Sequence, residues 1–360
     1  MRVLYDGCLS AEPRSGIERY FTMLVMNLPD CVQVSCSAPG QGRNGRIGGH
    51  VVEAPPFPLF KPRRVAGFLN KMYWTGKGFD VVHWIQYGPS QLARCLCVKG
   101  VPFVLTVHDL IHEIHGAPPG LLDRPARQAS YDKASAILCV SSNTRDDLLR
   151  QYEVDPSKVH VVHHGSSIQS SSPTPKAGHG DGRYFLYVGP RGGYKNFPAI
   201  MPGLKAVTGV HPDVKLRIVG NPLGEGEKEM VRDFGLAGAV VEEGRVDDRR
   251  LGELYAGAVA LLHPSLHEGF GIPLVEAMSC GTVPVATYSS CVPEVLGDAG
   301  VHVRPDEVQE GFHAAMLNLL DDPGFRKSKV AGCLERAKRF NWKETANRTF
   351  EVYSSVTSPM

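Results

Sequence analysis

The chain has 360 residues, of which 42% are hydrophobic and 21% are charged, and its formal net charge is +2. This chain is longer than a domain with a single hydrophobic core usually is, and its length suits two domains. The hydrophobic content excludes a disordered chain. A net charge so close to zero gives no field that would draw the protein to nucleic acid, so we exclude a nucleic-acid partner.

The cysteines and the N-terminal residues predict a cytoplasmic protein. None of the nine cysteines shows a zinc-binding spacing, so we expect reduced, mostly buried thiols. The opening stretch MRVLYDGCLS has no long apolar region, and no run of about 18 apolar residues follows. We therefore expect neither a signal peptide nor a membrane-spanning helix.

Short apolar runs rich in β-formers alternate with amphipathic segments in the first half of the chain. The first run is followed by a helical pattern from Ser15 to Leu28. This alternation predicts βα units and a parallel sheet with helices on both faces. The predicted strands are 2–6, 81–84, 102–107 and 136–140.

Residues 54–79 carry five Lys or Arg and no acidic residue. Apolar side chains within 61–77 have helical spacing, so this segment is a candidate for peripheral contact with an anionic membrane at its inner face. The alternative, a helix packed on its own sheet with a basic outer face, is favoured because one amphipathic helix is a weak signal.

A segment rich in Ser, Pro and Gly, 169–182, predicts a linker, after which the alternation of strands and helices restarts. We expect an α/β protein with two doubly wound Rossmann-like domains, 1–168 and 183–340, that face each other across a cleft. A C-terminal helix within 341–360 can pack back on the N-terminal domain. The predicted strands of the second half are 184–188, 214–219, 239–241, 259–263 and 283–287.

Ligands of open α/β sheets bind beyond the carboxyl ends of the strands, so polar residues there are candidates for function. His108 follows strand 102–107 and points to a cleft. His112 and His115 continue at helical spacing, which leaves a metal site as one interpretation. The pattern is not the His-Glu-x-x-His of zinc proteases, so we favour the interpretation that these are ordinary buried or surface histidines.

Three further strand-end loops are candidates for contact with a phosphorylated ligand. Gly16 opens a helix near the end of the first strand and allows a phosphate to approach, although Ser15 as an ordinary helix cap explains this loop equally well. Arg191 and Lys195 flank a glycine-rich turn and suit a diphosphate; solvated surface cations are the alternative. Gly220 would allow a base or ribose to lie close to the backbone at this strand end. The alternative is that Gly220 simply forms a turn.

The stretch HEGFGIPLVEAMSCG, residues 267–281, places two carboxylates around a strand-to-helix turn. Gly271 and Pro273 predict a turn whose backbone N–H groups and helix N-terminus face one anion. A carboxylate beside a phosphate is repelled by it, so Glu268 and Glu276 are expected to bind neutral sugar hydroxyls next to the phosphate.

The stretch 267–281 resembles the signature of retaining family-4 glycosyltransferases of the GT-B fold. VGPRGGYKNF, TVHDLI, VSSNTRDDL and CVPEVLGDAG follow the pattern of that family in the same order. The resemblance covers nearly the whole chain and is densest from 184 to 300.

The resemblance implies a role for each candidate residue. Glu276 would bind the ribose, Glu268 the donor sugar, and Arg191 and Lys195 the diphosphate leaving group, with His108 beside the reacting sugar. The remaining donor contacts would come from Gly16, Gly220 and the backbone of Phe270, Gly271 and Ile272. Members of the family need no metal and no cofactor beyond the nucleotide sugar itself.

Two departures from the family pattern concern the first half. The N-terminal loop carries one glycine, Gly16, where many relatives carry two or three. His163 and His164 replace a more usual Tyr-Pro pair, and the aspartate that usually follows the next glycine is absent.

The expected function is retaining transfer of a hexose from GDP-mannose or a UDP-hexose to a saccharide or lipid-linked acceptor in polysaccharide or glycolipid assembly. A covalent glycosyl-enzyme remains an open alternative to direct attack by the acceptor. A non-catalytic nucleotide-sugar-binding protein and a sugar-nucleotide epimerase or phosphorylase of similar architecture are the competing hypotheses.

Overall fold

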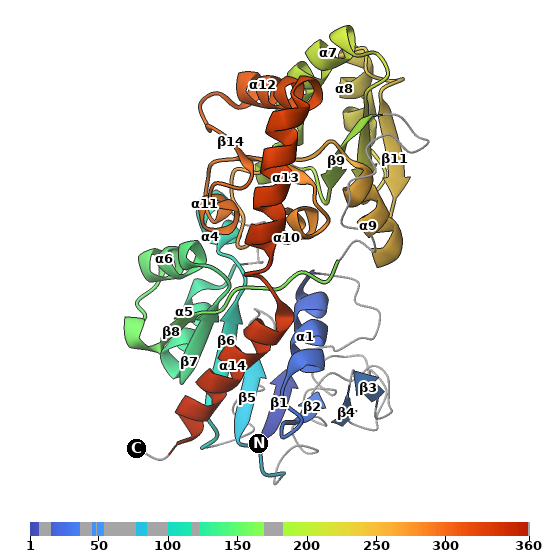
Figure 1. The fold of residues 1–360 in the computed structure, drawn as a ribbon. Helices are drawn as coiled ribbons and strands as arrows, with labels where there is room; N and C mark the ends of the chain where they lie inside the picture. Colours follow the sequence, from blue (N-terminus) through green and yellow to red (C-terminus); the bar gives the residue numbers. More distant parts are fainter. Residues whose placement is uncertain are drawn as a thin grey trace. The chain divides into compact units, whose positions relative to one another are not determined.

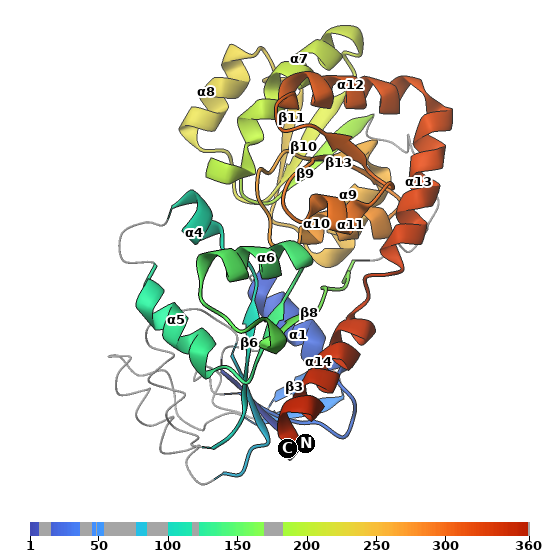
Figure 2. The same ribbon diagram turned by 90° about the vertical axis from the view of Figure 1, so that its left-hand side faces the viewer.

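The computed structural model of the chain divides into two compact units (Figure 1, Figure 2). Unit 1 contains Met1–His164 and Trp342–Met360, and unit 2 contains Gly165–Asn341. The predicted linker and residues 61–76 of the segment that is a candidate for membrane contact lie outside the described residues. The structure describes residues 1–6, 16–36, 45–47, 49–53, 77–84, 100–116, 122–168 and 183–358.

Unit 1 is built on an eight-stranded sheet of order β3-β4-β2-β1-β5-β6-β7-β8, which is parallel except for the pair β3 and β4. The sheet grows outward from β1 in one direction and then from β5 in the other, as in a doubly wound fold. Its strands are β1 Arg2–Asp6, β2 Gln33–Cys36, β3 Gly45–Ile47, β4 His50–Glu53, β5 Val81–Trp84, β6 Phe103–Val107, β7 Ala136–Cys139 and β8 Val159–Val161. Its helices are α1 Gly16–Asn27, α4 Ile111–His115, α5 Arg124–Lys133, α6 Ser142–Gln151, the 3₁₀ helix η1 Pro156–Lys158, and α14 Trp342–Thr357.

Side chains of the central strands alternate between two cores, one on each face of the sheet. Val104 and Leu138 join a core that includes side chains of α1 and α14. Leu105 and Cys139 join a second core with side chains of α5 and α6. Figure 2 shows α5 and α6 on one side of the sheet and α14 on the other. Burial on both faces explains why these strands read as continuous apolar runs.

Helix α14 joins unit 1 although it follows the whole of unit 2 in sequence. Trp342, Ala346 and Tyr353 lie on one of its faces and are each less than 5% exposed. That face packs into the core that α1 covers.

Unit 2 is built on a six-stranded parallel sheet of order β11-β10-β9-β12-β13-β14. The chain moves from β9 to one edge and then returns to start again at β12, so the topological switch point lies between β9 and β12. Its strands are β9 Tyr184–Val188, β10 Lys215–Val219, β11 Val240–Gly244, β12 Ala260–His263, β13 Val283–Thr287 and β14 Val301–Val303. Its helices are the 3₁₀ helices η2 Gly193–Lys195 and η3 Phe197–Ile200, then α7 Met201–Val210, α8 Glu225–Asp233, α9 Asp248–Gly257, α10 Ile272–Ser279, α11 Val292–Leu296, α12 Val308–Asp321 and α13 Pro323–Ala337.

The predicted fold class is confirmed for each unit, since both are α/β with doubly wound parallel topology. The six cysteines that fall within the described residues are free thiols, and all but Cys31 are buried. Among the described helices, none combines the length and apolarity that crossing a membrane requires.

Candidate functional site

The loops that follow β9 and β12 lie side by side, because these two strands are neighbours at the switch point of unit 2. The backbone N–H of Leu266 donates to the carbonyl oxygen of Tyr194 at 2.8 Å. Beside this bond, Lys195 Nζ donates to Glu268 Oε1 at 2.6 Å. The structure thus brings together two of the predicted site residues, 73 positions apart in sequence, where open α/β sheets bind ligands.

Glu268 is 8% exposed and has a second basic neighbour, His263 Nε2, 3.1 Å from the same carboxylate oxygen. Burial alone would raise the pKa of Glu268, but the contact with His263 and the positive charge of Lys195 outweigh burial and hold the pKa at about 2. Glu268 is therefore an ionised carboxylate at every pH near neutrality, which leaves it an acceptor of hydrogen bonds.

The turn after Glu268 depends on glycine. Gly271 is the N-cap of α10 and has a left-handed backbone, with φ of 76°. A Cβ at this position would lie 2.8 Å from Leu274 Cδ1, so a larger residue would be both strained and crowded. Phe270 is buried and packs edge-on against Phe340 at 5.7 Å between ring centroids. These contacts fix the N-terminus of α10, whose first residue is Ile272.

Glu276 lies in α10 and is 4% exposed. The hydroxyl of Tyr255, from α9, donates to Glu276 Oε2 at 3.0 Å. The second predicted carboxylate is thus buried in the same unit as the first, with its orientation set by a tyrosine.

Arg191 has a different neighbourhood from Lys195. Its Nε and Nη2 atoms donate to the two carboxylate oxygens of Glu227 in α8, at 2.8 and 3.0 Å, and Nη2 also donates to the carbonyl oxygen of Pro222. Arg191 is 8% exposed, and its Nη1 has no hydrogen-bond partner within the described part of the chain. The guanidinium group is held by α8 and is not joined to Glu268.

Gly220 brings the loop after β10 against the loop after β9. Its φ is 143°, and a Cβ there would lie 3.0 Å from the carbonyl oxygen of Gly189 and 3.9 Å from Arg191 Nη1. Only glycine accommodates this close approach of two backbones.

His108 and Gly16 belong to unit 1. His108 follows β6, is 9% exposed and meets the ring of Tyr20 edge-on at 5.0 Å between centroids. Burial lowers the pKa of His108 to about 4, so the imidazole is neutral at pH 7. Gly16 is the exposed first residue of α1. The metal alternative at His108, His112 and His115 gains no support, because no metal-binding group of three occurs among the described side chains.

Behind His108, a chain of hydrogen bonds links α14 to the central strands of unit 1. The hydroxyl of Tyr353 is bonded to that of Tyr5 at 2.9 Å and to His83 Nδ1 at 2.5 Å. His83 Nε2 is 2.7 Å from Thr106 Oγ1, which is in turn 3.3 Å from the Tyr20 hydroxyl. All five side chains are buried, so each needs these partners.

We expect unit 1 to lose stability as the pH falls below about 6.5. Burial lowers the pKa of His83 to about 3, that of His108 to about 4, and that of His164 well below its ordinary value. Between about pH 6.5 and its lowered pKa, each of these histidines is protonated in the unfolded chain but neutral in the folded chain. Each therefore lowers the free energy of unfolding by up to about 1.4 kcal/mol for every pH unit of acidification in that range.

Urea unfolding at pH 7 and pH 5, followed by tryptophan fluorescence, measures this effect. All three tryptophans lie in the sequence of unit 1, at positions 74, 84 and 342. A His83→Gln variant, which takes up no proton, should show a shallower pH dependence. Equal unfolding free energies of the unmodified protein at the two pH values would contradict the claim that these histidines stay neutral in the folded protein.

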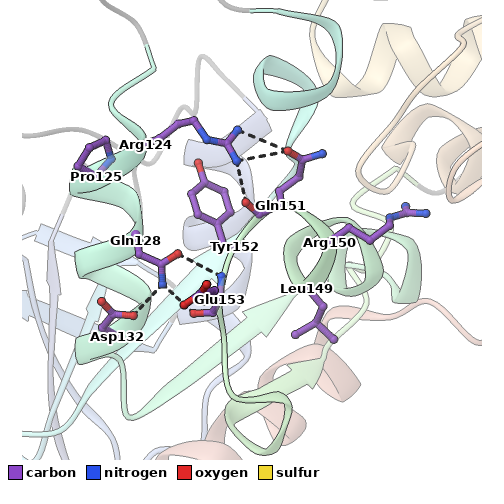
Figure 3. A pocket seen from close by; sticks show the side chains of 9 residues that line it. All are labelled: Arg124, Pro125, Gln128, Asp132, Leu149, Arg150, Gln151, Tyr152 and Glu153. Atoms are coloured by element: carbon purple, nitrogen blue, oxygen red, sulfur yellow. Dashed lines mark hydrogen bonds between the residues drawn. The ribbon is translucent and has the colours of Figure 1, made fainter.

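A pocket of about 640 Å³ lies elsewhere in unit 1, between α5 and the end of α6 (Figure 3). Its polar groups bond mainly to one another: Arg124 Nη2 donates to the Gln151 carbonyl oxygen, and Gln128 Nε2 donates to Asp132, each at 2.7 Å. It contains none of the predicted site residues. Its lining is Arg124, Pro125, Gln128, Asp132, Leu149, Arg150, Gln151, Tyr152 and Glu153.

Sequence reasoning missed four residues that shape the site: His263, Tyr255, Glu227 and Ser290. His263 was detectable in principle, as a polar residue at the end of an apolar strand. Tyr255 lies with Leu251 and Leu254 on the buried face of α9, so in the sequence it looks like an ordinary core residue. Glu227 lies in α8 among other acidic residues and looks like a solvated one. Ser290 contacts the backbone of Glu268, and no side-chain pattern in the sequence reports such a contact.

Two family models match the chain and together cover most of it. Residues 14–169 match Glycosyltransferase Family 4, and residues 173–339 match Glycosyl transferases group 1.

Curated relatives match over most of their own length. The MMP alpha-(1->4)-mannosyltransferase of Mycolicibacterium hassiacum is 30% identical over 300 residues, 77% of this chain and 71% of that protein. The O-antigen chain mannosyltransferase B of Escherichia coli is 29% identical over 330 residues, 82% and 78% of the two chains. The D-inositol 3-phosphate glycosyltransferase of Thermobispora bispora is 28% identical over 349 residues, 87% and 81% of the two chains.

Solved structures share the fold. Anabaena HepE in complex with UDP and glucose superimposes with a TM-score of 0.77 at 20% identity, covering 98% of this chain and 99% of that one. WaaG, a glycosyltransferase involved in lipopolysaccharide biosynthesis, has a TM-score of 0.73 at 16% identity, covering 99% of this chain and all of that one.

Proposed function

Because this chain belongs to glycosyltransferase family 4 and is a glycosyltransferase that uses a nucleotide sugar, we propose that it transfers a hexose with retention to a saccharide or lipid-linked acceptor. The donor is GDP-mannose or a UDP-hexose. Mannose is the first candidate, because two of the curated relatives are mannosyltransferases.

The observation that carries this proposal is the Lys195–Glu268 pair at the switch point of unit 2. Lys195 supplies a positive charge for the diphosphate that leaves, and Glu268 supplies an ionised acceptor for hydroxyls of the transferred sugar. The pair keeps both groups charged until the donor arrives between their loops. Arg191 and Glu276 complete the donor site in this proposal. Arg191 would give up part of its contact with Glu227 in order to bind the donor phosphate.

In the proposed reaction, the bond between the anomeric carbon and the phosphate oxygen breaks, and a bond from the same carbon to the acceptor oxygen forms on the same face. The acceptor hydroxyl gives its proton to the departing phosphate. Neutral His108 contributes a hydrogen bond to the reacting sugar and no charge, since its pKa of about 4 keeps it unprotonated.

Thermal unfolding with a panel of UDP, GDP and ADP and their sugars tests the donor. A nucleotide that binds only the folded protein at 100 times its Kd adds about 2.7 kcal/mol, which corresponds to a shift of about 5–10 °C in the Tm of a unit of this size. Calorimetry is the suitable readout, because no tryptophan occurs in the sequence of unit 2. We expect a shift with GDP and GDP-mannose, and no shift with ADP.

A Glu276→Gln variant is the matched test of the ribose contact, since it keeps the side-chain volume and removes the charge. We expect a smaller shift with the same nucleotide. Binding without transfer or donor hydrolysis would favour a non-catalytic nucleotide-sugar-binding protein instead, and donor hydrolysis lost on adding a chelator would contradict a metal-independent reaction.

A further inference from the structure

The loop that carries Glu268 is held on its second side by the loop that follows β13. Strand β13 is the other neighbour of β12, so the ends of the two strands are adjacent. The backbone N–H of Glu268 donates to Ser290 Oγ at 2.9 Å. The neighbouring Ser289 Oγ donates to the carbonyl oxygen of Ser265 at 3.2 Å. The candidate carboxylate is therefore fixed by its side chain toward β9 and by its backbone toward β13.

Ser290 has an unfavourable backbone conformation, with φ of 46°. Among the described non-glycine residues, positive φ occurs at two positions, Ser290 and Asn196. Asn196 directly follows Lys195, so the two strained positions lie next to the two members of the ion pair. Strain of this kind persists where the surrounding structure imposes it, and it gathers at sites where side chains must be held in one place.

A serine at position 290 gives two things at once. Its left-handed backbone turns the loop, and its hydroxyl oxygen meets the N–H of Glu268. Glycine would adopt the same φ at less cost, but it has no oxygen to offer. The combination of a strained backbone with a hydroxyl indicates that the hydroxyl is the reason for serine at this position.

We propose that Ser290 is a positioning residue for sugar transfer: it fixes the backbone of Glu268 so that the carboxylate stays where Lys195 and the donor sugar meet it. The inference rests on the proposed function, because it assigns Ser290 an action that passes through Glu268. Ser290 itself touches neither donor nor acceptor in this proposal.

The test compares Ser290→Ala with Ser289→Ala, a neighbouring serine that braces the same segment without contacting Glu268. We expect Ser290→Ala to lower kcat about 10-fold or more, because small displacements of a catalytic group are costly, while the donor KM stays within about 2-fold. Ser290→Gly should lose as much activity as Ser290→Ala, since both lack Oγ. Ser289→Ala should remain within about 3-fold of the unmodified protein.

A double-mutant cycle with Glu268→Gln separates positioning from general support of the loop. If Ser290 acts through Glu268, adding Ser290→Ala to Glu268→Gln changes kcat by less than about 2-fold. Hydrogen exchange of a peptide that spans residue 268 should become faster in Ser290→Ala and not in Ser289→Ala.

Additive losses in the cycle, or equal losses in the two serine variants, would overturn the positioning role while leaving the proposed function intact. Full recovery of kcat in Ser290→Gly would overturn it too, because the strain rather than the hydroxyl would then be responsible. An unmodified protein that transfers no sugar from any donor would overturn both, and this outcome is seen before any variant is compared.

Discussion

Replacing Glu268 with glutamine is expected to lower the kcat of sugar transfer by about 10²–10³-fold, the usual cost of removing one preorganised electrostatic contact from an active site. Glutamine has nearly the same volume, so the loop keeps its shape. The substitution removes the charge that pairs with Lys195 and His263 and brings an amide donor toward two basic groups. Release of the nucleoside diphosphate in the presence of acceptor measures the rate.

Glu243→Gln is the matched control. Glu243 is also a carboxylate with two basic partners, Arg217 and Arg250, and its side chain is 12% exposed against 10% for Glu268. It lies on the edge strand β11, away from the switch point. We expect the kcat of the Glu243→Gln variant to remain within about 2-fold of that of the unmodified protein. A Glu268→Gln enzyme with unchanged kcat would show that this carboxylate has no part in transfer.

Replacing Tyr353 with alanine should lower the free energy of unfolding of unit 1 by about 4–6 kcal/mol. The ring is fully buried between α14 and the sheet, so its removal leaves a cavity. Its hydroxyl is also the bonding partner of Tyr5 and His83, which would lose it inside a core. Urea unfolding followed by tryptophan fluorescence measures the change.

Tyr353→Phe divides this loss into its two parts. Phenylalanine keeps the packing and removes the hydroxyl, so we expect a cost of about 1–3 kcal/mol for the two polar groups that lose a partner. If Tyr353→Phe is as stable as the unmodified protein, the hydrogen-bond chain contributes nothing and the helix is held by packing alone. Loss of transfer activity in a stable Tyr353→Phe enzyme would instead indicate that the hydrogen-bond chain supports the function of His108.

The central strands of both units were predictable because each is mainly a run of apolar residues. Strands 81–84, 184–188 and 283–287 were predicted to the residue. The strands that escaped prediction lie toward the edges of the two sheets, outside the central strands: β2, β3, β4, β8 and β14. Their pairing depends on the neighbouring strand, which a local pattern does not reveal.

The candidate site was predictable as far as strand ends define it. Lys195 and Glu268 follow strands that can be recognised in the sequence, and neighbouring strands bring their ends together. The partner of Arg191 was not predictable, because Glu227 lies 36 residues further on in a helix with several other acidic residues. Tyr353 and His83 are 270 residues apart, and only the folded chain shows that they meet.

The split of unit 1 between the two ends of the sequence has a consequence for biosynthesis. Eight strands of this unit leave the ribosome first, yet α14, which covers part of its core, is made only after all of unit 2. At about 5–20 residues per second, translation of unit 2 lasts on the order of 10 s. During this time the apolar surface that receives Trp342 and Tyr353 is uncovered. We therefore expect unit 2 to complete its fold first, while the nascent N-terminal part of unit 1 exposes apolar surface for longer.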